Sequence, residues 1–348
     1  MPRNRLITTA VVSLALVTLG AACGNDDDGS DVRDISEDCE SSGSASASGS
    51  AGASGSASAS GSASGSGSAS GSASDCPLGS GSASASGSGS GIASEVEGSS
   101  TDNPLVQAAV DDYGAYVAEQ VDETIAATTT FTDAVRAGDL EGAKAAYAPS
   151  RQGWERIEPI AGLVEEIDGK VDARVDDFEG EDDPAFTGWH RLEYILWELG
   201  TTDGAGEFAD QLDADLQTLK TELEGIEIPP AALAVGSSEL IEEVSTGKIT
   251  GEEDRYSGTD LWDFAANVEG SQTAFDLLVP ALEEEDPELV TSIEDQFAEL
   301  DDQLSAYAEG EGYQPYSALT EPDKTEMQTT LAELSENLAT VAGVLGLE

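Results

Sequence analysis

The sequence predicts an all-α fold for the part of the chain from residue 101 onward. Helix-start signals, in which Asn, Asp or Glu precedes Pro, recur through residues 101–348. Apolar residues between these signals repeat three or four apart, and the alternating patterns typical of strands are nearly absent. Long helices with short joins are typical of antiparallel bundles, so we expect two four-helix-bundle-like halves.

The first predicted half contains four helical segments. They run from Asn103-Pro104 to about Thr128, from Asp139 to Ile167, from Phe186 to Trp197, and from about Gly206 to Leu223. Pro159 lies inside the second segment and is expected to bend it, because proline removes a backbone hydrogen bond. Asp183 and Pro184 precede the third segment, as an N-cap and a proline at the first helical position.

The second predicted half also contains four segments. They run from Pro229-Pro230 to before Gly247, from Leu261 past a kink at Pro280, from Asp286-Pro287 to Tyr307, and from Glu321-Pro322 to about Leu345. The connection Thr246–Phe264, TGKITGEEDRYSGTDLWDF, has an acidic cluster, glycines and aromatics that are unusual for a linker. Helix capping around Thr259 and Asp260 explains part of it.

Residues 1–22 have the pattern of a lipoprotein signal peptide. Arg3 and Arg5 precede the apolar run Leu6–Leu19, and small residues lead to Cys23. We expect Cys23 to be lipidated, with an ordinary secretory signal cut nearby as the alternative. Either signal predicts export.

Residues 23–100 are predicted to be a low-complexity flexible linker. Residues 41–100 are almost entirely Ser, Ala and Gly, and such a segment has no apolar surface to offset the entropy of ordering. Coil scaling gives this segment a typical reach of roughly 40 Å. The composition therefore predicts a tether before the helical domain, which we assign to residues 101–348.

The charge balance limits the classes of partner. The chain has 14 Lys+Arg and 70 Asp+Glu, a formal net charge of −56. This argues strongly against nucleic acid, because phosphate contacts need basic side chains, and against adsorption to anionic lipid heads. All three cysteines precede residue 101, which excludes a thiolate catalyst or a cysteine-based zinc site in the helical domain.

The segment FTGWHRLEYILW contains His190, the only histidine of the chain. His190 and Glu193 are three residues apart, so both side chains lie on one face of the predicted helix. Aromatic residues surround that face, and a carboxylate there is costly without a positive partner. A bound metal cation is one interpretation, and a hydrogen-bonded histidine–glutamate pair in the core is the other.

Other acidic patterns extend the candidate site. Glu155 and Glu158 are one helical turn apart beside a core stripe, either as ligands or as part of a solvated face. Asp172 and Asp176 lie in VDARVDDFEG and are candidate oxygen ligands. This loop lacks the spacing and the closing glutamate of an EF-hand.

Five segments carry a resemblance to a known family. They are SRxxWERIEPIA (Ser150–Ala161), RVDDFEG (Arg174–Gly180), FTGWHRLEYILW, EEVSTGKITGEEDRYS (Glu242–Ser257) and TDLWDFAANVEG (Thr259–Gly270). Together they resemble the imelysin (peptidase M75-like) family, and more narrowly its EfeO-type iron-uptake members. The resemblance covers essentially all of residues 101–348.

The resemblance implies an exported protein of two four-helix bundles with a metal site. The residues it assigns to that site are His190, Glu193, Glu155, Glu158, Asp172 and Asp254. Oxygen ligands with one imidazole suit iron (Fe2+/Fe3+) and also accept copper or zinc. The resemblance further implies two partners, a membrane iron permease and a haem-type (Dyp) peroxidase.

Two departures from the family pattern follow from the same comparison. Longer members carry a cupredoxin-like domain before the helical part, and here the Ser/Ala/Gly segment stands in that place. Gly258 stands where members often have a histidine.

The sequence therefore predicts a non-enzymatic, iron-binding lipoprotein on the outer face of the cell membrane or in the periplasm, which captures iron and delivers it to a permease. A metal-dependent peptidase is an alternative, although the single histidine excludes a two-histidine zinc site within one chain. A polysaccharide-binding or adhesion protein is a further alternative.

Overall fold

The computed structural model describes residue 96 and residues 99–347. The predicted signal peptide, Cys23 and nearly all of the predicted linker lie outside the described residues. Within the described part, α-helices and short 3-10 turns form the fold, with a single two-stranded hairpin, which confirms the all-α prediction. None of the helices in this part is both long and apolar enough to cross a membrane.

The first half contains five α-helices and two 3-10 turns. They are α2 (Pro104–Ala137), α3 (Leu140–Ile157), η1 (Glu158–Val164), α4 (Glu165–Val171), η2 (Val175–Asp177), α5 (Gly188–Trp197) and α6 (Gly206–Gly225). The long helix α2 packs against α3 and α6, and α5 packs against α3 and α6. The buried side of α2 includes Val106, Tyr113, Val117 and Val121.

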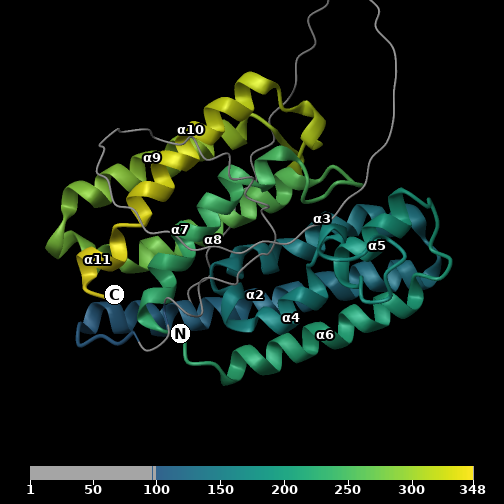
Figure 1. The fold of residues 1–348 in the computed structure, drawn as a ribbon, viewed down its shortest axis with the longest axis horizontal. Helices are drawn as coiled ribbons and strands as arrows, with labels where there is room; N and C mark the ends of the chain where they lie inside the picture. The colour runs from purple at the N-terminus through teal and green to yellow at the C-terminus, as the bar shows by residue number, and fades with distance from the viewer. Residues whose placement is uncertain (1–95, 97–98, 348) are drawn as a thin grey trace, which may run out of the picture. The chain divides into compact units, whose positions relative to one another are not determined.

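The second half is built around α7 and α8. Its elements are α7 (Pro230–Thr246), η3 (Lys248–Thr250), α8 (Asp260–Glu285), α9 (Pro287–Ser305), β1 (Ala308–Glu309), β2 (Gly312–Tyr313), η4 (Tyr316–Ala318), α10 (Glu321–Leu338) and α11 (Val341–Leu345). Helix α10 packs on α7 and α9, and α9 also packs on α8. In Figure 1, α9 and α10 lie on the opposite side of α7 and α8 from the blue and teal first half.

The two halves share one hydrophobic core, and glycines allow their helices to approach closely. Helix α8 packs against α3, and α7 packs against η1. A Cβ at Gly270 of α8 would overlap the carbonyl oxygen of Arg156, and one at Gly236 of α7 would overlap that of Pro159. The close approach brings the acidic connection between α7 and α8 next to α3.

Several helix boundaries differ from the sequence prediction. The last segment, predicted to reach about Leu345, ends as α10 at Leu338, and the short helix α11 follows it. The segment predicted from Asp139 to Ile167 is broken: α3 ends at Ile157, and the 3-10 turn η1 carries Pro159 before α4 begins. Proline cannot donate the hydrogen bond that an α-helix requires, so a break replaces the expected bend. Helix α2 continues past Thr128 to Ala137, where Gly138 ends it in the left-handed conformation.

Helix α5 begins two residues later than predicted. Gly188, the first residue of α5, has φ +76°, and a Cβ there would overlap the carbonyl oxygen of Val171. The prediction of Asp183 as the N-cap is wrong. Its carboxylate instead accepts the backbone N–H of Ala185 in the turn before the helix.

Candidate metal centre

The imidazole of His190 lies at the centre of a buried group of carboxylates. Helix α5 places His190 and Glu193 one turn apart, and the exposed fractions of the two residues are 2% and 0%. His190 Nδ1 lies 3.3 Å from a Glu193 carboxylate oxygen, and Nε2 lies 3.5 Å from a carboxylate oxygen of Asp172. Each ring nitrogen therefore faces acidic oxygen atoms.

The Nδ1 side brings together His190, Glu193 and Asp254, with candidate ligand atoms within 4.8 Å of one another. Glu193 Oε1 accepts the backbone N–H groups of Tyr256 at 2.9 Å and Ser257 at 2.7 Å. This leaves Oε2 facing the imidazole. Neighbouring donors of this kind fix the orientation of metal-ligating carboxylates.

Asp254 is held from both of its oxygens. Tyr147 donates its hydroxyl to Asp254 Oδ1 at 2.8 Å, and the Thr259 hydroxyl donates to Oδ2. The Tyr147 oxygen also lies 3.4 Å from His190 Nδ1. The Nδ1 side therefore has a phenol next to its two carboxylates.

The Nε2 side brings together Asp172, His190 and Glu253, again within 4.8 Å. Asp172 accepts the indole N–H of Trp154 at 2.9 Å, and Glu253 accepts a guanidinium N–H of Arg174 at 2.9 Å. Two ligand atoms bound to one ion at about 2.0–2.2 Å lie at most roughly 4.4 Å apart. Both sides thus have nearly the spacing that a metal ion needs.

Arg151, from α3, supplies positive charge to the Nε2 side. Its guanidinium is fully buried and forms ion pairs with Asp172, with Glu155, with Glu253 at 3.2 Å and with Asp263 at 3.3 Å. Its Nη1 lies 3.2 Å from His190 Nε2. The other arginine near the histidine, Arg191, donates to the carbonyl oxygen of Glu181, away from the carboxylates.

Glu155 and Glu158 lie in a neighbouring cluster around Lys248. The Lys248 ammonium is 3.0 Å from Glu155 and 2.7 Å from Glu158, and Asn267 donates to both carboxylates. Both glutamates are buried, at 0% and 8% exposure, so the interpretation as a solvated face is wrong. Glu155 also joins this cluster to the first through Arg151.

Asp176, the other loop carboxylate, lies apart from both groups. It forms an exposed ion pair with Arg255. Among the six residues assigned by the resemblance, Glu193, Asp172 and Asp254 therefore surround the imidazole of His190, and Glu155 and Glu158 form the neighbouring cluster.

Sequence reasoning missed four members of the site. They are Tyr147, Arg151, Lys248 and Glu253. Glu253 and Lys248 lie in the unusual connection before α8, and Arg151 lies in the segment SRxxWERIEPIA, so the composition of both segments contained the signal. No periodicity showed which of their side chains would turn inward.

The ionisation of the site follows from burial and close charges. Burial and Arg151 lower the pKa of His190, but hydrogen bonds to Asp172, Glu193 and Glu253 raise it more, so that it lies well above its usual value. Burial and the charge of Asp254 raise the pKa of Glu193. Burial would raise the pKa of Glu253, yet Lys248, His190 and Arg174 hold it well below its usual value.

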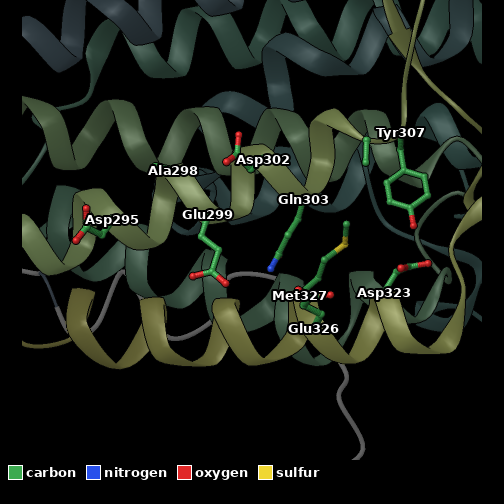
Figure 2. A pocket seen from close by; sticks show the side chains of 10 residues that line it. Asp295, Ala298, Glu299, Asp302, Gln303, Tyr307, Asp323, Glu326 and Met327 are labelled. Atoms are coloured by element: carbon green, nitrogen blue, oxygen red, sulfur yellow. The ribbon is translucent and has the colours of Figure 1, made fainter.

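A second acidic region lies on the surface between α9 and α10. Figure 2 shows Glu299 extending from α9 toward α10, with Glu326 on α10 and Asp323 farther along α10 near Tyr307. The cavity has a volume of about 640 Å³ and is also lined by Asp295 and Asp302. Four of these five acidic residues are exposed and Asp323 is half-buried, so solvent rather than protein surrounds most of the carboxylates.

Comparison with known proteins assigns the chain to a family. Residues 109–342 match the model of the imelysin (peptidase M75) family. The chain belongs to the imelysin family.

The chain is also similar to curated proteins named iron uptake system component EfeO. It is 47% identical over 241 residues to the protein of Escherichia coli O157:H7, and 46% identical to those of Escherichia coli K12 and Shigella flexneri. Each match covers 69% of this chain and 64% of the relative. The chain thus spans slightly less than two thirds of the length of these relatives. The names of the relatives describe uptake components rather than enzymes.

Proposed function

We propose that the chain is an extracytoplasmic iron-binding protein that captures iron and delivers it to a membrane iron permease. One observation carries the proposal: a single imidazole has buried carboxylates at both nitrogens, and backbone or side-chain donors orient each carboxylate. The similarity to proteins named iron uptake system components supports iron as the cargo.

The residues divide into three roles in this proposal. His190, Glu193 and Asp254 bind the ion at the Nδ1 side, where no lysine or arginine of the described residues approaches closer than 3.8 Å to Asp254. Asp172 and Glu253 form a second position for an ion at the Nε2 side, beside Arg151. Glu155 and Glu158 extend the negative field of the centre around Lys248. Hard oxygen ligands with one imidazole favour iron, and copper or zinc also suit such a set.

The proposed setting follows from the N-terminal sequence. Lipid on Cys23 would anchor the protein to the outer face of the cell membrane, and residues 23–100 would tether the helical domain. The permease then receives the iron, and a haem-type peroxidase of the same uptake system is the second proposed partner. Metal binding, rather than peptide hydrolysis, is the proposed activity.

Binding by this centre depends on pH in a defined direction. The raised pKa of His190 means that its imidazolium loses a proton when the ion binds, so affinity rises with pH. An affinity that stays constant from neutral pH down to about pH 4, through the carboxylate and histidine range, would contradict this centre.

Calorimetric titration of the full chain tests the function. Iron, copper, zinc and calcium are titrated at high ionic strength, which suppresses loose binding to the acidic surface. The double variant His190→Ala, Glu193→Ala is expected to lose saturable iron binding. The matched control Glu333→Ala, Glu336→Ala removes two exposed carboxylates, also three residues apart on α10, and is expected to bind iron as the natural chain does.

Two results would argue against the proposal. One is weak binding of every ion, unchanged by the double variant, which would leave His190 and Glu193 as a core pair. The other is equal loss of binding in the control variant, which would assign the signal to the acidic surface.

A further inference from the structure

The guanidinium of Arg151 occupies the space that an ion would need on the Nε2 side. It contacts Asp172 and Glu253, which are the two carboxylates of that side, and lies 3.2 Å from the imidazole nitrogen between them. Arg151, His190 and Glu253 are buried, and the side chain of Asp172 is 8% exposed. A cation of the protein itself therefore lies inside the carboxylate cage, which is the space bounded by Asp172, Glu253 and the imidazole of His190.

We propose that Arg151 is a positioning residue that acts as an internal counter-cation, competing with the cargo ion for Asp172 and Glu253 and so weakening the hold on that ion. This inference rests on the function proposed above and deepens it. Arg151 neutralises the cage when no ion is present, and the ion gains only the difference between its own attraction to the carboxylates and that of the guanidinium.

The contacts of Arg151 allow such an exchange without unfolding of the centre. The same guanidinium also pairs with Glu155 and Asp263, neither of which belongs to the ligand groups around His190. These two carboxylates can retain the guanidinium when an ion takes Asp172 and Glu253. The Trp189 ring, 5.6 Å from the guanidinium carbon, adds a further contact that favours a nearby cation.

Lys248 does not have this role. Its ammonium bonds to Glu155, Glu158 and to no atom of His190, and its distance to Glu253 is 3.8 Å. Arg151 is thus the cation, among the described residues, that contacts the imidazole and the carboxylates together. A moderated affinity is useful for a carrier, because an ion bound by uncompensated buried carboxylates would leave slowly.

The test compares Arg151→Gln, Arg151→Lys and the control Arg156→Gln in the full chain. Arg156 lies on the same helix and pairs with Glu269 near the surface. The measurements are the Kd for Fe2+ under anaerobic conditions, the Kd for Zn2+ as a redox-inert probe, and the melting temperature without metal. A pH near 8 limits protonation of the carboxylates.

We expect Arg151→Gln to bind both ions about tenfold tighter or more, and to melt at a lower temperature without metal. Arg151→Lys keeps the charge but cannot hold several carboxylates at once. Its affinity and its melting temperature should therefore fall between those of the natural chain and those of Arg151→Gln. Arg156→Gln should bind as the natural chain does.

A purely structural role for Arg151 predicts the opposite sign for binding. If folded Arg151→Gln binds the ions as the natural chain does or more weakly, the inference is wrong. If Arg151→Gln does not fold without metal, Arg151→Lys decides: tighter binding than the natural chain supports the inference, and equal or weaker binding overturns it. Failure of the natural chain to bind iron saturably would instead refute the proposed function itself.

Discussion

The His190 centre and the pocket between α9 and α10 are both rich in carboxylates, but they differ in what surrounds each oxygen. At the centre, Glu193 and Asp254 accept bonds from backbone and side-chain donors, and Nδ1 of the His190 imidazole faces both carboxylates. In the pocket, Glu299 and Glu326 are exposed and the lining has no histidine (Figure 2). Both regions are negatively charged, but only at the His190 centre are the carboxylates buried and oriented by donors.

The difference has an energetic cause. An exposed carboxylate remains hydrated and has no desolvation cost. An acidic surface is therefore stable without a bound ligand. A buried carboxylate costs several kcal/mol unless a cation or donors compensate it. The centre carries this cost at several residues and compensates part of it with Arg151 and Lys248. In the proposed function, the remaining negative charge would be balanced by the bound ion.

Among the variants that distinguish buried from exposed charge, Lys248→Met is expected to have the largest effect, a loss of stability. The change leaves Glu158 buried without its cation and Glu155 with Arg151 alone, and we expect the free energy of unfolding near pH 7 to fall by about 3–5 kcal/mol. Urea unfolding measures the loss. The matched change Lys220→Met breaks a surface pair with Asp122 and should cost at most about 1 kcal/mol. Similar losses in both variants would remove the distinction between buried and exposed charge.

Asp254→Asn tests whether iron binding depends on the His190 centre or on the surface pocket. The amide has nearly the same shape but loses the charge that faces His190, so we expect the Kd for iron to rise about a hundredfold. Asp302→Asn makes the same change in the surface pocket and should leave the Kd unchanged. Calorimetry at high ionic strength gives both values, and a larger effect at Asp302 would reverse the assignment of the site.

Tyr147→Phe tests the oriented donors. The variant removes the hydroxyl that bonds to Asp254, and we expect about tenfold weaker iron binding with a loss of roughly 1 kcal/mol in stability. Tyr313→Phe serves as a control, because Tyr313 lies on β2 and packs against Trp262. Unchanged iron binding in Tyr147→Phe would show that orientation of Asp254 does not depend on the phenol.

The smallest expected effect is on the pH dependence of stability. It comes from Asp168, a buried residue outside the ligand groups. Burial, with the charge of Asp172, raises the pKa of Asp168 from 3.8 to about 8. A carboxyl whose pKa is higher in the folded state contributes stability below its unfolded pKa, and this contribution is lost as the pH rises through about 8.

Asp168→Asn should therefore stabilise the unloaded chain by at least about 1 kcal/mol near pH 9, and by less near pH 5. Glu326→Gln, in the exposed pocket, should change stability by less than about 0.5 kcal/mol at either pH. Thermal melts at the two pH values measure both variants. A stability difference for Asp168→Asn that does not grow with pH would contradict the raised pKa.

Local patterns explain which parts of the fold were predictable. Proline after an acidic or amide residue marked the starts of α2, α9 and α10 correctly, because capping is decided by neighbouring residues. The break at η1 was harder, since a proline within an apolar pattern is compatible with either a kink or a new element. Local signals also placed His190 and Glu193 on one helical face.

The rest of the centre depends on contacts between distant segments. Arg151 meets Asp172, Glu253 and Asp263, which lie 21, 102 and 112 residues along the chain. No spacing rule relates these positions, and the close packing of α8 on α3 through Gly270 brings them together. Sequence patterns therefore identified candidate ligands but could not show that the protein provides its own cations among them.

Anomalous diffraction at the iron absorption edge, on crystals of the iron-loaded chain, would locate the bound iron. We expect an iron peak within bonding distance of a His190 ring nitrogen, with carboxylate oxygens of Glu193 and Asp254 as neighbours. A peak confined to the pocket between α9 and α10, or the absence of any ordered peak at His190, would contradict this expectation.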